Sequence, residues 1–286
     1  MVKHDVLSIL EVITKSSEYL KRKGISNYKI DAEWLVAFAL GCKRMELYLR
    51  FGEILPHHKL AEIKALVMER GLRVPLQHIL GQVQFTGLKL KSDHRALVPR
   101  FETEFLVDYL YQRLTPEFNG KIADLGCGSG AIILGLCSMM PKSSGDGFDN
   151  SHQALTLAKE NLVLCKLENR VCFKNFDWLK NKKLQEKYDL VVSNPPYLSI
   201  EEWSECEPEV KIYDPKGALV SEKDGLCDLE SVISVASKSL KKNGYLALEF
   251  GQNQADLVSD LLSAHFTAEI ISDQYLVRRF ALAVRK

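Results

Sequence analysis

The most constraining feature of this sequence is a buried-strand pattern that runs directly into a glycine-rich turn and then into a helix. Residues 122–131 read IADLGCGSGA, with glycines at positions 126, 128 and 130. Glycine lets the backbone turn tightly and lets a ligand approach the main chain closely. Dinucleotide-binding proteins use a close relative of this turn, and position 131 is Ala, which their G-x-G-x-x-G/A form also allows. The turn therefore predicts a cofactor-binding α/β fold without fixing the cofactor.

Short apolar segments alternate with helical segments after this turn, which indicates a parallel sheet covered on both faces. The last two strand-like runs, at 268–271 and 278–284, are joined by about six residues, too few for a helical crossover, so the last strand should be antiparallel. This pattern suits a Rossmann-like class I methyltransferase better than a dinucleotide dehydrogenase. We expect strands at 121–125, 190–193 and 245–250, weaker ones near Phe148 and Val171, and helices at 102–114, 131–139, 151–164, 228–240 and 254–264.

The N-terminal third has a different pattern. From residue 5 to about residue 80 apolar residues recur at helical spacing, with breaks at Gly24, Gly41 and Pro56, which predicts a small all-α domain over residues 1–80. Residues 81–100 alternate with period two around a glycine and predict a β-hairpin linker to a domain at residues 101–286. Residues 1–85 carry 13 basic and 9 acidic side chains, a mild positive charge that suits an acidic or RNA-bearing partner.

Composition excludes several classes of protein. The chain has 38 Lys and Arg against 37 Asp and Glu, so it carries no bulk signature of a nucleic-acid binder. No stretch approaches the roughly 18 apolar residues of a membrane span, and residues 1–5 lack the apolar run of a signal peptide, so we expect a cytoplasmic protein. The seven cysteines are scattered without a CxxC pair, so neither a disulfide framework nor a metal site is expected.

Two acidic residues, one just before the glycine turn and one well after it, stand at positions where a cofactor would need them. Asp124 comes just before the turn, where a carboxylate can pair with an ammonium group; the alternative is an aspartate that merely ends a strand. Asp149 follows Gly130 by 19 residues and can accept both hydroxyls of a ribose. The alternative for Asp149 is a plain helix N-cap. Residues 143–148 read SSGDGF, which is poor strand sequence before such a site.

The most specific signal is Asn194-Pro195-Pro196-Tyr197, directly after a strand pattern. Two prolines make the backbone rigid and leave carbonyl acceptors without amide donors. An amide or adenine amino nitrogen is a poor nucleophile because its lone pair is delocalised. The side-chain oxygen of Asn194 and the carbonyl of Pro195 can hold its two hydrogens, while Tyr197 stacks on the planar group. Orientation then carries catalysis without a strong general base. The alternative, a rigid turn after a strand, does not account for its position in the fold.

With these motifs the chain resembles the HemK/PrmC family, the peptide chain release factor glutamine N5-methyltransferases. NPPY alone is shared with adenine-N6 DNA methyltransferases, whereas the PRxETE and LExGxxQ segments are more restricted to this family. The segments that carry the resemblance are residues 31–35 (DAEWL), 39–41 (ALG), 75–81 (PLQHILG) with Phe85 and Gly87, 98–104 (VPRFETE), 124–130 (DLGCGSG), 177–178 (DW), 194–197 (NPPY) and 248–254 (LEFGQNQ).

The resemblance implies a cofactor, a substrate and a set of site residues. The cofactor is S-adenosylmethionine, and the substrate is the Gly-Gly-Gln glutamine of class-1 release factors, with no direct nucleic-acid or membrane partner. Arg100 and Glu102 would border the substrate, although an interdomain salt bridge explains them equally well. The expected substrate ligands are Asn194, Pro195, Pro196 and Tyr197, of which Asn194, Pro195 and Tyr197 would be catalytic. The expected cofactor ligands are Asp124, Gly126, Cys127, Gly128, Ser129, Gly130, Asp149, Trp178 and Asn194.

Three departures from the family pattern concern the fit to a particular protein substrate. Phe101 replaces a proline, Asp214 replaces the glutamate of Tyr-Glu-Pro, and Leu276 replaces the glycine of a terminal Asp-x-x-Gly. Two other functions stay open: glutamine methylation of a ribosomal protein, and adenine-N6 methylation of a nucleic acid. The second normally needs basic patches or a recognition domain, and the sequence shows neither.

Overall fold

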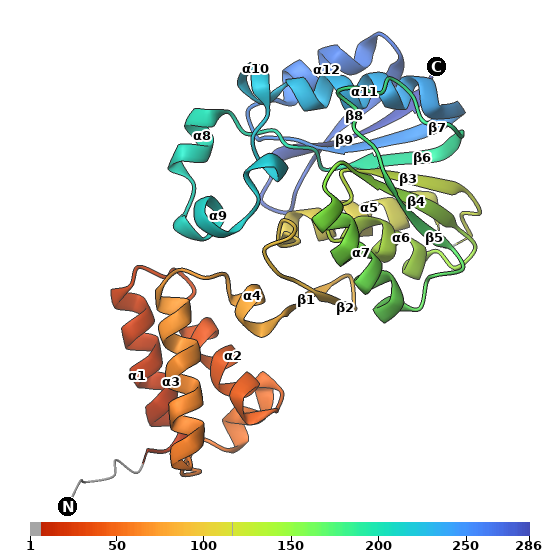
Figure 1. The fold of residues 1–286 in the computed structure, drawn as a ribbon. Coiled ribbons are helices and arrows are strands. Elements are labelled where there is room, and N and C mark those ends of the chain that lie inside the picture. Colours follow the sequence, from red (N-terminus) through yellow and green to blue (C-terminus); the bar gives the residue numbers. More distant parts are fainter. Residues whose placement is uncertain (1–6, 116) are drawn as a thin grey trace, which may run out of the picture. The chain divides into compact units, whose positions relative to one another are not determined.

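The computed structural model describes residues 7–115 and 117–286, which form two compact units (Figure 1). The first unit contains the chain up to Gly81 together with residues 208–213, and the second contains residues 82–207 and 214–286. Residues 1–6, which include the segment used to exclude a signal peptide and the start of the predicted helical pattern, lie outside the described residues.

The first unit is helical, as its apolar spacing predicts. Ser8 and Glu11 form a capping box that begins the first helix, and Gly41 ends the second in the left-handed conformation with φ 65°. The apolar faces of the three long helices pack on one another around buried Ile9, Leu35 and Ile63. The helices are α1 (Ile9–Arg22), α2 (Tyr28–Leu40), the 3-10 helix η1 (Arg44–Leu49), α3 (His57–Gly71), α4 (Leu76–Leu80) and α9 (Pro208–Tyr213).

A buried ion network joins three helices of this unit. The Arg70 guanidinium on α3 lies 2.8 Å from Asp31 on α2 and 2.9 Å from Glu209 on α9. Arg73 donates to Glu209 at 2.7 Å. The Asp31 and Arg70 side chains are 7% and 8% exposed, and burial raises the pKa of Asp31 although Arg70 opposes this by hydrogen bonding. Arg70 therefore compensates a carboxylate that burial would otherwise destabilise.

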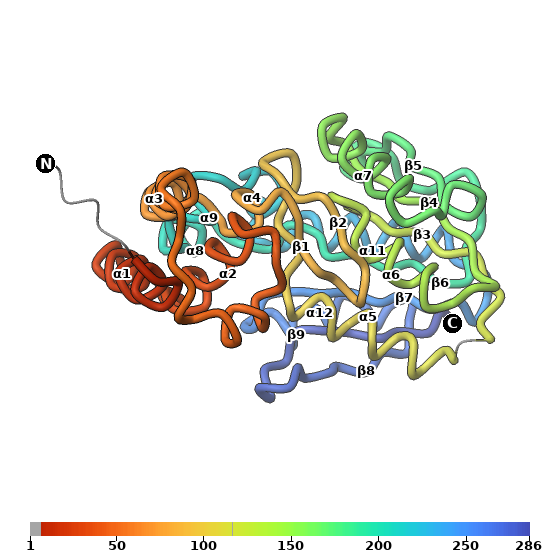
Figure 2. The backbone as a smooth tube through the Cα atoms, turned by 90° about the horizontal axis from the view of Figure 1, so that it is seen from below, coloured from red at the N-terminus to blue at the C-terminus, as the bar shows by residue number. Residues whose placement is uncertain are grey.

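The second unit is built on a seven-stranded sheet in the order β5-β4-β3-β6-β7-β9-β8. β5 and β8 lie at its opposite edges (Figure 2). All pairings are parallel except those of β9, which confirms the mostly parallel sheet with one antiparallel C-terminal strand. The strands are β3 (Lys121–Leu125), β4 (Ser144–Asp149), β5 (Val171–Asn175), β6 (Tyr188–Ser193), β7 (Leu240–Glu249), β8 (Phe266–Ser272) and β9 (Arg278–Arg285).

Helices cover both faces of this sheet, and the alternation of side chains along β6 shows why. Leu190 and Val192 belong to one buried apolar cluster, whereas Val191 belongs to the other. The first cluster includes residues of α5, α6 and the hairpin, and the second includes residues of α11 and α12. The helices are α5 (Phe101–Leu114), α6 (Ala131–Met139), α7 (His152–Cys165), α8 (Ile200–Glu205), the 3-10 helix η2 (Lys216–Ala218), α10 (Glu222–Gly225), α11 (Cys227–Ser239) and α12 (Ala255–Ser263).

The predicted hairpin is present and belongs to the second unit. β1 (Gln82–Phe85) and β2 (Leu88–Lys91) pair antiparallel, with Phe85 and Leu90 buried. The sequence did not predict the short helices between residues 200 and 225. The helix predicted at 228–240 ends at Ser239, because Leu240 already belongs to β7.

β4 is a full strand although its sequence has low strand propensity, and packing explains the difference. A Cβ on Gly147 would lie 2.4 Å from the Phe173 ring of β5, and one on Gly145 would lie 2.5 Å from the Ile133 side chain of α6. The two glycines are therefore needed, because a larger residue at either position would clash with side chains packed against the strand. Tertiary packing overrides local propensity here.

Replacing Arg70 with Met should destabilise the first unit by about 3–5 kcal/mol, because it leaves the Asp31 carboxylate buried without a partner. The measurement is the free energy of opening of α2 and α3 amides by hydrogen exchange. Arg50→Met is the matched control, because Arg50 pairs with Glu53 at the surface, and it should change this free energy by no more than about 0.5 kcal/mol. Equal effects of the two substitutions would show that burial of the network does not stabilise the unit.

Candidate active site

The predicted motifs meet at one edge of the sheet. The glycine turn follows β3, Asp149 ends β4 and Asn194 follows β6. β3 pairs in parallel with β4 on one side and β6 on the other, so the carboxyl ends of the three strands lie together. The chain progresses from β3 toward β5 in one direction and from β6 toward β7 in the other, which creates the reversal point where open α/β sheets bind ligands.

The glycine turn has the conformation that its sequence predicts. Gly126, Gly128 and Gly130 have φ values of 77°, 54° and 83°, a region that other residues rarely adopt. The amides of Gly126 and Cys127 donate to the Phe148 carbonyl at 2.8 and 3.0 Å. Gly126 and Gly128 are partly exposed, whereas Cys127, Ser129 and Gly130 are buried. The turn therefore presents two of its glycines to the surface and packs the rest against the sheet.

A cavity of about 290 Å³, here called the loop cavity, opens beside this turn. It brings together five of the residues predicted to bind a cofactor: Gly126, Gly128, Asp149, Trp178 and Asn194. Trp178 is fixed there because its indole N–H donates to Asp228 Oδ1 at 2.7 Å, and Asp228 also lines the cavity. A Cβ on Gly126 would lie 3.2 Å from the Trp178 ring, so a side chain at this position would crowd the indole.

Asp149 is oriented by the backbone around it. Its Oδ2 accepts from the Gly128 amide at 2.9 Å and its Oδ1 accepts from the Ser151 amide at 2.8 Å. Burial raises the pKa of this carboxyl above its ordinary value. The N-cap of α7 is Ser151, which accepts from the Ala154 amide, so the alternative of Asp149 as a plain N-cap is wrong. Each carboxylate oxygen keeps a further lone pair for donors in the loop cavity.

Asp124 lies beneath the turn and is fully buried. Its Oδ2 accepts from the Ile133 amide at 3.2 Å, whereas its Oδ1 has no hydrogen-bond partner within the described part of the chain. Burial raises the pKa of Asp124 to about 8, and the negative charge of Asp149 adds to this. A buried acceptor without a partner is unusual in native proteins, so this oxygen is a candidate for a ligand contact.

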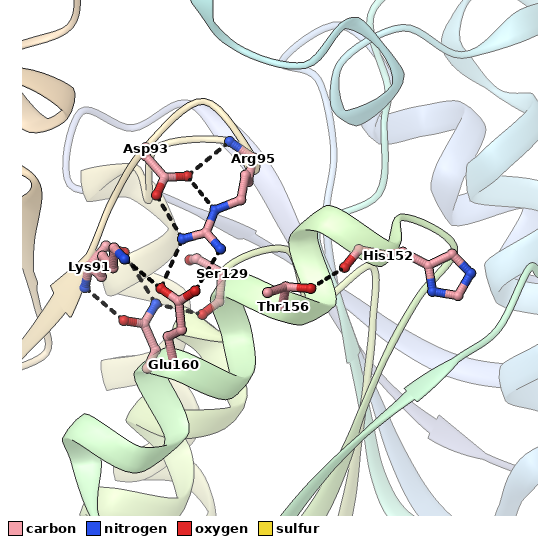
Figure 3. A network of polar contacts seen from close by, with 8 residues as sticks. Lys91, Asp93, Arg95, Ser129, His152, Thr156 and Glu160 are labelled. Atoms are coloured by element: carbon pink, nitrogen blue, oxygen red, sulfur yellow. Dashed lines mark hydrogen bonds and ion pairs between the residues drawn. The ribbon is translucent and has the colours of Figure 1, made fainter.

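One wall of the loop cavity was missed by sequence reasoning. Arg95, Ala96 and Leu97 line it, and a polar network holds their segment on α7 (Figure 3). The Arg95 guanidinium lies 2.7 Å from Glu160 and 2.8 Å from Asp93. The Asn161 side chain accepts from the Lys91 amide and donates to the Ser129 carbonyl. The contacts of Glu160 with Arg95 and of Asn161 with Lys91 join residues 65 and 70 positions apart, and no local pattern indicates them.

A second cavity of about 60 Å³, here called the NPPY cavity, adjoins the first. Its wall includes Arg100, Pro195, Tyr197 and Glu249. Three residues line both cavities: Leu97, Asn194 and Ala218. Asn194 therefore stands at the border between the two, with Gly126, Gly128 and Pro196 in the wall of the loop cavity and Pro195 and Tyr197 in the wall of the NPPY cavity.

The NPPY segment is held by residues of the LEFGQNQ segment. Gln254 Nε2 donates to the Tyr197 carbonyl at 2.9 Å, and its Oε1 accepts from the Gly251 amide. Glu249 is buried at the end of β7, and burial raises its pKa to about 7. Burial and the negative charge of Glu249 raise the pKa of the Tyr197 hydroxyl. The sequence placed these segments in the family pattern but gave no role to Gln254 or Glu249.

The structure also places Arg100 and Glu102 and the three positions that depart from the family pattern. Arg100 lies 2.5 Å from Asp214 in the second unit, so the alternative of an interdomain salt bridge is wrong for this residue. Glu102 does not line the NPPY cavity, but its charge raises the pKa values of Tyr197 and Glu249. Phe101 is the exposed first residue of α5. Leu276 stands where the family has glycine and adopts φ 62°, the left-handed conformation that glycine favours.

Among the described residues, no helix is both long and apolar enough to cross a membrane. No group of three or more His, Cys, Asp or Glu side chains in this part of the chain is arranged to hold a metal ion.

Comparison with known proteins agrees with this geometry. Residues 11–81 match the PrmC N-terminal domain family, and residues 101–206 match the methyltransferase small domain family. A release factor glutamine methyltransferase of Fusobacterium nucleatum is 39% identical over 254 residues, which cover 88% of this chain and 72% of that protein. Another, from Deinococcus radiodurans, is 35% identical over 280 residues, 98% of this chain and 99% of that protein.

A solved structure shares the fold of a large part of this chain. The T. thermophilus 16S rRNA N2 G1207 methyltransferase (RsmC), solved in complex with AdoMet and guanosine, matches with a TM-score of 0.50 at 16% identity, over 72% of this chain and 50% of that one. At this identity the match shows the fold alone, whereas the relatives above share sequence along most of their length. The chain belongs to the family of release factor glutamine methyltransferases.

Proposed function

We propose that this protein transfers a methyl group from S-adenosylmethionine to the side-chain amide nitrogen (N5) of the glutamine in the Gly-Gly-Gln motif of class-1 peptide chain release factors. The observation that carries this proposal is the position of Asn194, which lines both the loop cavity and the NPPY cavity. A methyl donor in the first cavity and an amide in the second would meet at this residue. The family to which the chain belongs supports the same reaction.

The loop cavity fits S-adenosylmethionine in the chemistry of its donors and acceptors. Gly126 and Gly128 leave the main chain open to a ligand, and Asp149 offers carboxylate oxygens to the ribose hydroxyls. Trp178 offers an aromatic face to the adenine. Asp124 does not itself line the cavity, but it lies two positions before Gly126, and we assign its unpartnered Oδ1 to the ammonium group. Cys127, Ser129 and Gly130 are buried, so we assign them to the shape of the turn. When bound, the cofactor supplies an electrophilic methyl group on a sulfonium.

The NPPY cavity supplies what a glutamine amide needs in order to react. The Asn194 Oδ1 and the Pro195 carbonyl accept the two amide hydrogens and turn the π face of the nitrogen toward the donor. Tyr197 packs on the planar group, and Pro196 keeps the loop rigid. The two hydrogen bonds strengthen as positive charge develops on nitrogen, so they stabilise the transition state more than the ground state. Arg100 borders the cavity and is anchored by Asp214.

The protein partner is a class-1 release factor, and the first unit is the part of the chain that we assign to recognising it. This unit has its own hydrophobic core, and an apolar hollow of about 510 Å³ lies along α1 and α3, with Lys15 and Lys64 in its wall. A translation factor as substrate places the enzyme in the cytoplasm. A nucleic-acid base is a less suitable substrate, because the NPPY cavity is small and a flipped adenine is larger than an amide.

Replacing Asn194 with Ala should lower kcat roughly 100- to 1000-fold, as is typical when one preorganised hydrogen-bonding group is removed from an active site. The measurement is transfer of label from S-adenosylmethionine to a purified release factor, with the Gly-Gly-Gln peptide mapped by mass spectrometry. Asn119→Ala, an exposed asparagine outside both cavities, is the control and should keep wild-type activity. Label on DNA or on a ribosomal protein, with none on the release factor, would reject the proposed substrate.

The affinity for S-adenosylmethionine should rise with pH up to about 8, because the ammonium group pairs only with the ionised form of Asp124. Since the raised pKa leaves this carboxyl largely protonated at pH 6–7, the gain should approach tenfold per pH unit. Calorimetric titration at several pH values measures it. Asp124→Asn keeps an oxygen for the Ile133 amide but lacks the charge, so it should bind weakly with a flatter pH profile. The same slope in both proteins would contradict the pairing.

A further inference from the structure

The Asn194 side chain has two ends of similar shape and opposite chemistry. Its Oδ1 accepts hydrogen bonds, whereas its Nδ2 donates them. Under the proposed function, on which this inference rests for its catalytic consequence, only the oxygen end can hold a glutamine NH2. A rotation of the amide by 180° would place donor against donor. The structure therefore has to contain a group that fixes which end faces the substrate.

A chain of two hydrogen bonds runs from Asn194 to a buried carboxyl. Asn194 Nδ2 donates to Thr103 Oγ1 at 3.2 Å, and Thr103 Oγ1 donates to Glu249 Oε2 at 2.8 Å. Thr103 lies in the first turn of α5 and Glu249 at the end of β7, and they are 5% and 2% exposed. Three elements that are distant in the sequence thus meet behind the side chain that borders both cavities.

When Glu249 is ionised, the directions of these two hydrogen bonds are fixed. A carboxylate only accepts, so the single hydroxyl proton of Thr103 must point to Glu249. The hydroxyl then has only lone pairs left for Asn194, and the side of the amide that faces it must be the NH2. The Oδ1 is consequently turned away from Thr103 and left for a donor. A protonated Glu249 loses this directionality, because the hydroxyl proton is then able to turn toward Asn194.

We propose that Thr103 and Glu249 are positioning residues that fix the orientation of the Asn194 amide, so that its oxygen is presented to the substrate. They act through Asn194. They explain why the PRxETE and LExGxxQ segments accompany NPPY in this chain. Thr103 comes from the first segment and Glu249 from the second, and their hydrogen bonds form a relay with a fixed direction that ends at Asn194.

Groups on α5, on β9 and in the NPPY segment act on Glu249. Glu102 on α5 raises its pKa and Arg279 on β9 lowers it, while the Thr103 hydrogen bond and the nearby Asn194 amide lower it against the larger effect of burial. Tyr197 lies 3.5 Å from its other oxygen. Since the balance leaves the pKa at about 7, the relay should lose its polarity as the pH falls below this value. The orientation of Asn194 should therefore titrate near neutral pH.

The first test observes Asn194 directly and does not depend on any substrate. Protein labelled with ¹⁵N-asparagine gives side-chain NH2 signals, and the Asn194 pair is identified by its loss in Asn194→Ala. We expect this pair to shift with pH with a midpoint near 7 in the wild type, and to lose the titration in Thr103→Val. A signal that is independent of pH between 5.5 and 8.5, or one unchanged by Thr103→Val, would overturn the proposal whatever the enzyme methylates.

The second test measures the consequence for catalysis. Thr103→Val, which keeps the shape and removes the hydroxyl, should lower kcat for the release factor roughly tenfold to a hundredfold, as expected for a lost hydrogen bond to a charged group. KM and S-adenosylmethionine affinity should change little, and Thr103→Ser should retain activity. In an Asn194→Ala background, Thr103→Val should have no further effect.

Two results of the second test would contradict the proposal: wild-type kcat in Thr103→Val, or additive losses in the double variant. A wild-type enzyme that leaves the release factor unmodified would reject the proposed function instead, and the NMR titration would still decide the orientation of Asn194. Thermal unfolding of each variant, together with its affinity for S-adenosylmethionine, separates a local effect on the asparagine from a loss of folding.

Discussion

The parallel pairing of β3 with β4 on one side and β6 on the other is the constraint on which the rest of the active site depends. Because the three strands point in the same direction, their carboxyl ends deliver the glycine turn, Asp149 and Asn194 to one edge of the sheet. The reversal of strand order at β3 separates the helices that follow and leaves room for a ligand. The two cavities that share Asn194 are a direct product of this topology.

Three buried or half-buried carboxyls around these cavities have pKa values raised by burial: Asp124, Asp149 and Glu249. In a stability-driven design such groups would be replaced, because burying a charge is unfavourable without full compensation. They differ in how far the protein satisfies them. Asp149 and Glu249 accept hydrogen bonds from neighbouring groups, whereas Asp124 keeps one oxygen without a partner. Incomplete satisfaction of this kind concentrates where ligands complete the site.

The limits of sequence-based prediction lie where packing overrides local preference. Residues 144–149 have low strand propensity, yet Gly145 and Gly147 are the residues that let neighbouring side chains pack closely on β4. Leu276 occupies a left-handed position that its chemistry disfavours, because the turn between β8 and β9 is set by Asp273, which accepts from the amides of Tyr275 and Val277. In both places the backbone conformation is fixed by packing or hydrogen bonds that the local residue propensities do not predict.

The sequence by itself determined most of the strands, the long helices and the motifs, because periodicity, glycine turns and proline pairs act over a few neighbouring residues. The strand before Gly126, the rigid loop at Asn194 and the antiparallel last strand all follow from such local rules. Only the tertiary structure decided that Arg100 pairs with Asp214 and that Thr103 and Glu249 meet behind Asn194. These partners are separated by about 90 to 150 positions, and hydrogen bonds act over about 3 Å, so their pairing depends on the folded arrangement of strands and helices.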